Sequence, residues 1–167
     1  MGTNVLIYLS AKDIIFRVYH SHVSRKGIFM NEKPIYITEY DLERMTSLVE
    51  AALKGNSRGR LHLSELQHEL ERAIIVTPQQ VPCDVVTMNS TVSLMDIHTA
   101  EEKTYTLVFP ENAHIEEGKI SILAPIGTAL IGYCVGDVIE WDVPSGRKTL
   151  QITKILYQPE AAGRYDL

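Results

Sequence analysis

Apolar residues recur at three- and four-residue spacing through residues 39–54, which predicts an amphipathic helix. Thr38 is a good N-cap, and acidic residues in the first turns suit the positive end of the helix dipole. Gly55 and Asn56 are typical of a helix end. The apolar side chains of this stripe are Leu42, Met45, Leu48, Val49, Ala52 and Leu53.

A second helix is predicted from Ser64, where Gln67 completes a capping box, to the stop at Thr77-Pro78. Its apolar stripe is Leu66, Leu70, Ala73 and Ile74. Because the intervening loop is short, the two helices should form an antiparallel hairpin with a short coiled-coil seam. The first helix would be about 24 Å long at 1.5 Å per residue. Helices of this length are marginal alone, so the hairpin should rest on the remainder of the chain.

The period changes from residue 82 onward, where alternating and β-branched residues predict strands. Pro125 suits the first turn of a short helix over residues 125–131, and Gly132 suits its left-handed stop. The pattern therefore predicts an α+β chain with about five antiparallel strands around one short helix, which separates the third strand from the fourth. The predicted strands are 82–97, 103–109, 119–123, 138–143 and 149–157, and the polar residues 159–165 are predicted to form a surface segment.

Composition and charge indicate which classes of protein the chain can belong to. The chain has 167 residues, and a hydrophobic content of 45% fits a globular protein. Its net charge of −5 argues against wholesale nucleic-acid binding. No apolar run reaches the roughly 18 residues that a membrane span needs. Cys83 and Cys134 have no metal-ligand spacing, and we expect them to be buried or half-buried free thiols in a reducing, cytoplasmic compartment.

Residues 1–29 differ from the rest of the chain. Four basic residues stand there against a single acidic one, Asp13, and no clear element emerges. We expect this extension to pack poorly. Met30 is a second candidate for the natural start, because codons for residues 25–27 can form a purine-rich sequence resembling a ribosome-binding site. The predicted organisation is an extension over 1–29, a helical hairpin over 30–80 and a sheet domain over 81–167.

No constellation in the sequence supports catalysis. The histidines are scattered, no serine or cysteine occupies a nucleophile motif, and we expect no catalytic residue, metal or cofactor. The tip of the hairpin carries Lys54, Arg58 and Arg60 and no carboxylate. It is either a solvated loop or a basic contact for an acidic partner or nucleic acid. The acidic residues of the two helices, Asp41, Glu43, Glu50, Glu65, Glu69 and Glu71, are interpreted as solvated faces.

Several motifs in order carry a family resemblance. The strand followed by residues 124–127, the run 129–132, the Gly136-Asp137 turn and the turn 144–146 resemble the C-terminal domain of the GreA/GreB transcript-cleavage factors. The closer resemblance is to the shorter Rnk-type members of that family. Residues 84–90 and 157–163 resemble these members nearly residue for residue. The resemblance covers about 30–167.

The resemblance implies an FKBP-like sheet domain and RNA polymerase as partner. In Gre factors this domain docks at the rim of the polymerase secondary channel, on a coiled coil of the largest subunit. A long coiled coil then carries an acidic tip to the catalytic magnesium. The docking residues implied here are Leu123, Ala124, Pro125, Ile126 and Gly127.

This chain departs from the Gre pattern in two places. Leu123 and Ala124 replace the acidic residue and the serine that usually precede the proline, and the hairpin is short with a basic tip. Rnk-type proteins share both departures and are thought to occupy the polymerase without stimulating cleavage. The resemblance thus implies a steric competitor of Gre factors that binds neither membranes nor, strongly, nucleic acid.

Two alternatives stay open. Pro125 and Gly127 would also be needed merely to start and pack the short helix, so docking and a structural role are not exclusive. The sheet domain could instead serve a general chaperone or protein-interaction module. A prolyl isomerase is less favoured, because it needs a deep aromatic-lined pocket and the core already requires several of the aromatic residues. Tyr133 and Trp141, for example, are interpreted as core or half-buried side chains.

Overall fold

A computed structural model describes residues 35–55, 60–143 and 146–165, without the side chains of residues 60–62, 141–143 and 147. The predicted extension over 1–29 lies outside these residues. Within the described part, residues belonging to the unit 31–167 form one compact body. The boundary drawn between a hairpin and a sheet domain at residue 80 stays a prediction.

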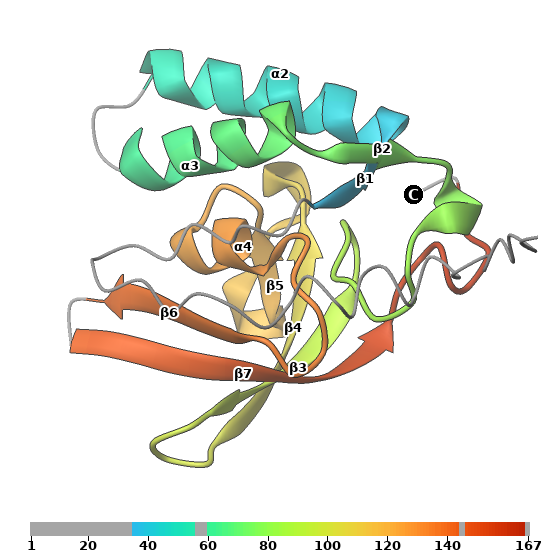
Figure 1. The fold of residues 1–167 in the computed structure, drawn as a ribbon. Coiled ribbons are helices and arrows are strands. Elements are labelled where there is room, and N and C mark those ends of the chain that lie inside the picture. Colours follow the sequence, from blue (N-terminus) through green and yellow to red (C-terminus); the bar gives the residue numbers. More distant parts are fainter. Residues whose placement is uncertain (1–34, 56–59, 144–145, 166–167) are drawn as a thin grey trace, which may run out of the picture. The chain divides into compact units, whose positions relative to one another are not determined.

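The helical hairpin is confirmed. Helix α2 (Glu39–Gly55) begins where Thr38 Oγ1 accepts a hydrogen bond from the backbone N–H of Asp41 at 3.2 Å, which is the predicted cap. Helix α3 (Arg60–Glu71) lies antiparallel beside it (Figure 1). Both helices contribute buried apolar residues, and the core cluster includes Met45 and Val49 from α2 and Leu66 and Leu70 from α3.

The limits predicted for the second helix are wrong. Helix α3 begins at Arg60 rather than at Ser64, because its apolar stripe starts one turn earlier with the buried Leu63. It ends at Glu71, and Ile74 belongs to strand β2 (Ile74–Val76) instead of to a helical face. Three consecutive β-branched residues favour this extended conformation. Strand β2 pairs in parallel with β1 (Tyr36–Thr38), a small sheet that the sequence did not predict.

The main sheet has the predicted five strands, arranged in the order β5-β4-β3-β7-β6. Figure 1 shows it curling around the short helix α4 (Pro125–Leu130), which follows β5 in the chain and precedes β6, as predicted. The mixed α+β class is therefore confirmed, whereas the finer FKBP-like assignment stays a prediction. The strands are β3 (Thr91–Asp96), β4 (Glu102–Val108), β5 (Lys119–Ser121), β6 (Val138–Val143) and β7 (Gly146–Tyr157).

The sheet is not wholly antiparallel. Strand β5 pairs with β4 in parallel, with Leu107 opposite Ile120. The reason is the connection: two short 3-10 turns, η2 (Pro110–Asn112) and η3 (Ile115–Glu117), carry the chain back before β5 begins. A direct hairpin would have reversed the strand, whereas this longer return restores its direction.

The first predicted strand is also shorter than expected, because only residues from Thr91 onward join the sheet. Residues 83–90 run through turns instead. Their apolar side chains are buried by the core, and their backbone pairs with the loop after α4: Val86 N–H donates to Tyr133 O at 2.8 Å and Gly132 N–H to Val86 O at 2.9 Å. Alternation here reflected burial rather than a sheet ladder.

One hydrophobic core joins the hairpin to the sheet. Met45 and Leu66 from the helices belong to the same buried cluster as Leu94, Leu130 and Ile152 from the sheet side. Gly132, which has a φ of 77°, permits a close approach, since a Cβ there would lie 2.1 Å from Cγ2 of Ile35. The predicted packing of the hairpin against the sheet is thus confirmed.

Candidate functional site

Residues 123–127, called here the loop 123–127, comprise the end of the turn after β5 and the first three residues of α4, and local hydrogen bonds fix them. Leu123 N–H donates to Ser121 Oγ at 3.1 Å, and Ala124 N–H donates to Ser121 O at 2.9 Å. Pro125 occupies the first helical position, where its missing N–H costs no hydrogen bond. The chain after β5 is therefore held in one defined turn.

The five candidate residues of this loop do not have the same environment. Pro125 is exposed, whereas Leu123, Ala124 and Ile126 are half-buried, and Leu123 and Ile126 pack partly against the core. Gly127 is buried, and a Cβ there would lie 2.0 Å from Ser121 O. Gly127 therefore has a packing role, while the other four residues present a small, largely apolar surface to solvent.

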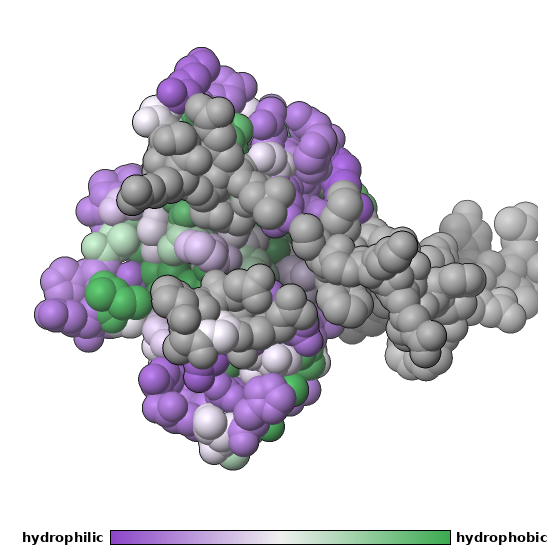
Figure 2. All heavy atoms as spheres, turned by 90° about the vertical axis from the view of Figure 1, so that its left-hand side faces the viewer, coloured by the Kyte–Doolittle hydropathy of each residue, from purple (hydrophilic) through white to green (hydrophobic). Residues whose placement is uncertain are grey.

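Hydrophobic residues gather on the side of the molecule shown in Figure 2. In the area not covered by grey atoms they lie at mid-height, at the level of α4 and β6 in Figure 1. Hydrophilic residues surround them at the top, where the helices lie, and at the bottom, where the β3–β4 hairpin lies. An apolar centre with a polar rim is the usual composition of a protein-binding surface.

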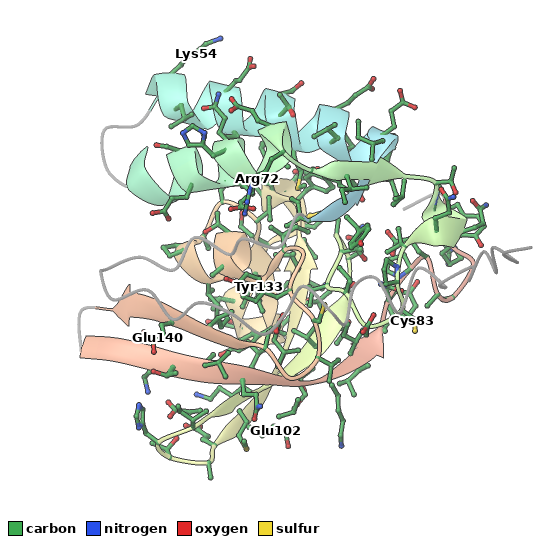
Figure 3. The ribbon with its side chains drawn as sticks, viewed as in Figure 1. Lys54, Arg72, Cys83, Glu102, Tyr133 and Glu140 are labelled. Atoms are coloured by element: carbon green, nitrogen blue, oxygen red, sulfur yellow. The ribbon has the colours of Figure 1, made fainter. Side chains whose placement is uncertain are left out.

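The predicted basic tip is described only in part. Lys54 is exposed in the last turn of α2 and points away from the body of the molecule (Figure 3). Arg58 lies outside the described residues, and Arg60 opens α3 with its side chain outside them. A cluster formed by these three basic residues stays a prediction.

Among the described residues, no three His, Cys, Asp or Glu side chains are grouped so as to hold a metal ion. In the same part of the chain no helix is long and apolar enough to cross a membrane. Cys83 is exposed at the surface (Figure 3), and Cys134 is half-buried, so the expectation that both thiols are covered holds only for the second.

Tyr133 is half-buried and packs against the core, as predicted, and burial raises the pKa of its phenol. The Trp141 side chain lies outside the described residues. Neither aromatic residue provides evidence for a ligand pocket in the sheet domain.

A buried polar cluster escaped the sequence-based interpretation. It joins the two segments that carry the closest family resemblance, 84–90 and 157–163. Gln158 Nε2 donates to Val85 O at 2.7 Å and to Pro82 O at 2.8 Å. Thr87 Oγ1 donates to Glu160 Oε2 at 2.8 Å. Gln158 and Glu160 are buried, so the chain after β7 enters the interior before the exposed residues 161–165, and its assignment to the surface is wrong for this first part.

Asp41 departs from the predicted solvated helix face. It is only 5% exposed, whereas Glu43 and Glu50, predicted for the same face, are exposed. Burial raises the pKa of the Asp41 carboxyl to about 6, and the nearby charge of Glu160 adds to the shift. Its hydrogen bond with Thr38 and the charge of Arg44 act in the opposite direction. The sequence contained an indication of this burial. Asp41, Met45 and Val49 are spaced four residues apart, so they lie on the same face of the helix.

Arg44 ties the hairpin to the sheet domain. Its guanidinium lies 3.7 Å from the centroid of the Phe109 ring, and its Nη2 lies 3.3 Å from Glu111 Oε1. Phe109 is buried, so the guanidinium covers an apolar surface while it keeps a hydrogen bond at its edge. Nothing in the local sequence around Arg44 predicts a partner 65 residues later.

Two family models match consecutive parts of the chain. The model of the Rnk N-terminus matches residues 33–76, which contain the helical hairpin, and the GreA/GreB C-terminal model of transcription elongation factors matches residues 81–157. The regulator of nucleoside diphosphate kinase of Escherichia coli K12 is 39% identical over 137 residues, which cover 81% of this chain and 98% of that protein. The chain belongs to the Rnk-type members of the GreA/GreB family.

Further relatives agree with this membership. The transcription elongation factor GreA of Chelativorans is 37% identical over 107 residues, covering 64% of this chain and 68% of GreA. A solved GreA/GreB elongation factor structure from Nitrosomonas europaea is 41% identical, with a TM-score of 0.64 over 74% of this chain and 99% of that one. The relatives of this Rnk-type chain are thus named as regulators and elongation factors, and the predicted family resemblance is confirmed.

Proposed function

We propose that this chain is a transcription regulator that binds RNA polymerase at the rim of the secondary channel through the loop 123–127. The observation that supports it best is that one residue of this loop is packed inside while the others reach the surface. Gly127 fixes the turn from inside, and the exposed Pro125 stands between half-buried apolar neighbours. A rigid turn with an apolar surface loses little conformational entropy when a partner covers it.

The proposed mechanism is steric. Helix α2 has 17 residues, so the arm is about 26 Å long at 1.5 Å per residue. The sequence from Lys54 to Arg60 contains no carboxylate that could help to hold a magnesium ion. Bound at the rim, the chain would cover the channel entrance and exclude longer-armed Gre factors, without supplying groups for transcript cleavage itself.

A double substitution tests the docking loop. Pro125→Ala with Ile126→Asp places a charge in the centre of the apolar surface and loosens the turn, and we expect at least a tenfold loss of affinity for RNA polymerase. The matched control is Pro110→Ala with Ile97→Asp, which makes the same two changes outside the loop, with Ile97 47% exposed. Far-UV circular dichroism and the unfolding midpoint would establish that both variants fold. Unchanged binding by the folded loop variant would show that the docking surface lies elsewhere.

A further inference from the structure

A cavity of about 430 Å³ opens beside the first turn of α2. Its walls come from four separated parts of the chain: the end of β1 with the first turn of α2, strand β2 with the η1 turn (Pro78–Gln80), Met88, and the segment 159–165. In Figure 1 these segments meet at one end, far along α2 from the hairpin tip. We call this cavity the α2 groove.

The α2 groove contains a buried carboxyl group, that of Asp41, with one oxygen that accepts no hydrogen bond from the described residues. Asp41 is buried, and its Oδ1 atom has no hydrogen-bond partner among the described residues. The second buried acid of the groove, Glu160, has its Oε2 bonded to Thr87 and contributes further negative charge. A buried carboxylate oxygen with no donor is unfavourable, so this position favours a ligand that brings a donor and a positive charge.

In the described part of the chain, the basic residues near Asp41 are engaged with other partners. Arg44, the basic residue of the same helix nearest to Asp41 in sequence, is stacked on Phe109 and paired with Glu111. Arg164 also lines the groove and has interactions of its own. Three acidic side chains, those of Glu39, Asp41 and Glu160, line the groove against that single basic one.

The rim of the α2 groove suits the rest of a basic side chain. Tyr40, Ile75 and Tyr165 all line it and are 55%, 57% and 50% exposed. Aliphatic stems of lysine and arginine pack along such surfaces, and aromatic faces attract the cation at their end. A multiply coordinated metal ion fits less well, because the described residues hold no group of three metal-ligating side chains.

We propose that the α2 groove is a second interaction site, which takes an arginine or lysine side chain from an extended segment of a protein partner. The partner's cation would reach the unpaired oxygen of Asp41, and its backbone would run over the exposed apolar residues of β2. This site is independent of the loop 123–127, so the double variant of that loop should retain it.

Two peptides test the proposal on the full chain. One is acetyl-Ala-Ala-Arg-Ala-Ala-amide, and the other has citrulline in place of arginine, which keeps the shape and removes the charge. We expect the arginine peptide to shift the amide NMR signals of Thr38, Asp41 and Glu160 saturably at millimolar concentration. Citrulline should weaken binding at least tenfold. Absence of saturable shifts, or equal binding of the two peptides, would overturn the proposal.

Matched variants of the chain test which carboxylate binds the arginine side chain of the peptide. Asp41→Asn should weaken the arginine peptide at least fivefold, whereas Glu43→Gln, which removes one charge from an exposed position of the same helix, should leave it unchanged. Glu160→Gln serves as a second variant if Asp41→Asn does not fold. Equal effects of the Asp41 and Glu43 variants would show that binding depends on the net charge of the chain. That result would overturn the assignment of the site to Asp41. Spermidine binding as tightly as the peptide would overturn the assignment to a protein partner.

Discussion

Asp41 lies on the same face of α2 as Met45 and Val49, although it is the only one of the three with a charge. Its carboxyl has a pKa of about 6 in the folded protein against an ordinary 3.8. Between these pH values the folded protein binds the proton more tightly than the unfolded chain does. The free energy of unfolding therefore falls as the pH rises from about 4 to above 6, by up to about 3 kcal/mol from this group.

We predict that Asp41→Asn removes this part of the pH dependence. The variant should match the wild type near pH 4 and exceed its free energy of unfolding above pH 6.5, by up to about 3 kcal/mol. Urea unfolding followed by circular dichroism at several pH values measures the difference. Titrating groups that do not interact with Asp41 are common to both proteins and cancel. Parallel pH profiles of the two proteins would contradict the raised pKa.

Gly127 gives a second prediction at the residue scale. The Ser121 carbonyl oxygen lies so close that an added Cβ requires the backbone of β5 or α4 to move. We expect Gly127→Ala to lower the free energy of unfolding by about 3 kcal/mol, the upper end of typical overpacking costs. Gly55→Ala is the control, because a Cβ there meets nothing within 4 Å and alanine favours the helix. Equal urea midpoints of the two variants would contradict the packing role of Gly127.

Residues governed by their neighbours in the chain were predictable. The Thr38 cap, the helix start at Pro125 and the left-handed Gly132 each follow from local geometry, and each is found. Asp41 and Glu160 were misassigned for the opposite reason. Their burial arises where the first turn of α2 meets the segment after β7, and a sequence pattern without tertiary contacts treats an acid as exposed.

At the scale of elements, α2 is attached to the sheet domain by Arg44 as well as by its apolar face. Arg44→Ala should lower the free energy of unfolding by about 1 to 2 kcal/mol, because it removes a cation–π contact with the buried Phe109 ring and uncovers that ring. Glu111→Gln should cost less than about 1 kcal/mol, since it disrupts only the exposed ion pair. Chemical denaturation compares the two. A larger effect of Glu111→Gln would contradict stacking as the main contribution.

Long, strongly patterned elements were predicted and short ones were not. Helix α2, strand β4 and the β6–β7 hairpin follow from their periods, since each spans enough residues to repeat its pattern. Strands β1 and β2 have three residues each, too few to show a period, and their pairing depends on the packing of two distant segments. The parallel direction of β5 follows from the return path through η2 and η3, which the strand's own residues do not encode.

At the scale of the molecule, the two segments that carry the closest family resemblance form one structural unit. Residues 84–90 and 157–163 are separated by most of the sheet in sequence, yet Gln158 and Glu160 bond to the first segment from the second. Glu160 also influences the charge on Asp41 in the hairpin. The polar cluster thus links the hairpin, the start of the sheet domain and its end. Under the proposed steric mechanism, it would hold the arm in one direction.

This fixed, short arm leads to the last prediction. If the chain occupies the channel rim without reaching the active site, it should not stimulate transcript cleavage by backtracked RNA polymerase. It should lower GreA-stimulated cleavage in proportion to the polymerase it occupies, to about half when half of the complexes are bound. The Pro110→Ala, Ile97→Asp control should compete like the wild type, and the Pro125→Ala, Ile126→Asp variant should not. Cleavage stimulated by this chain alone would refute the steric mechanism, because α2 is only about 26 Å long and its tip carries no carboxylate.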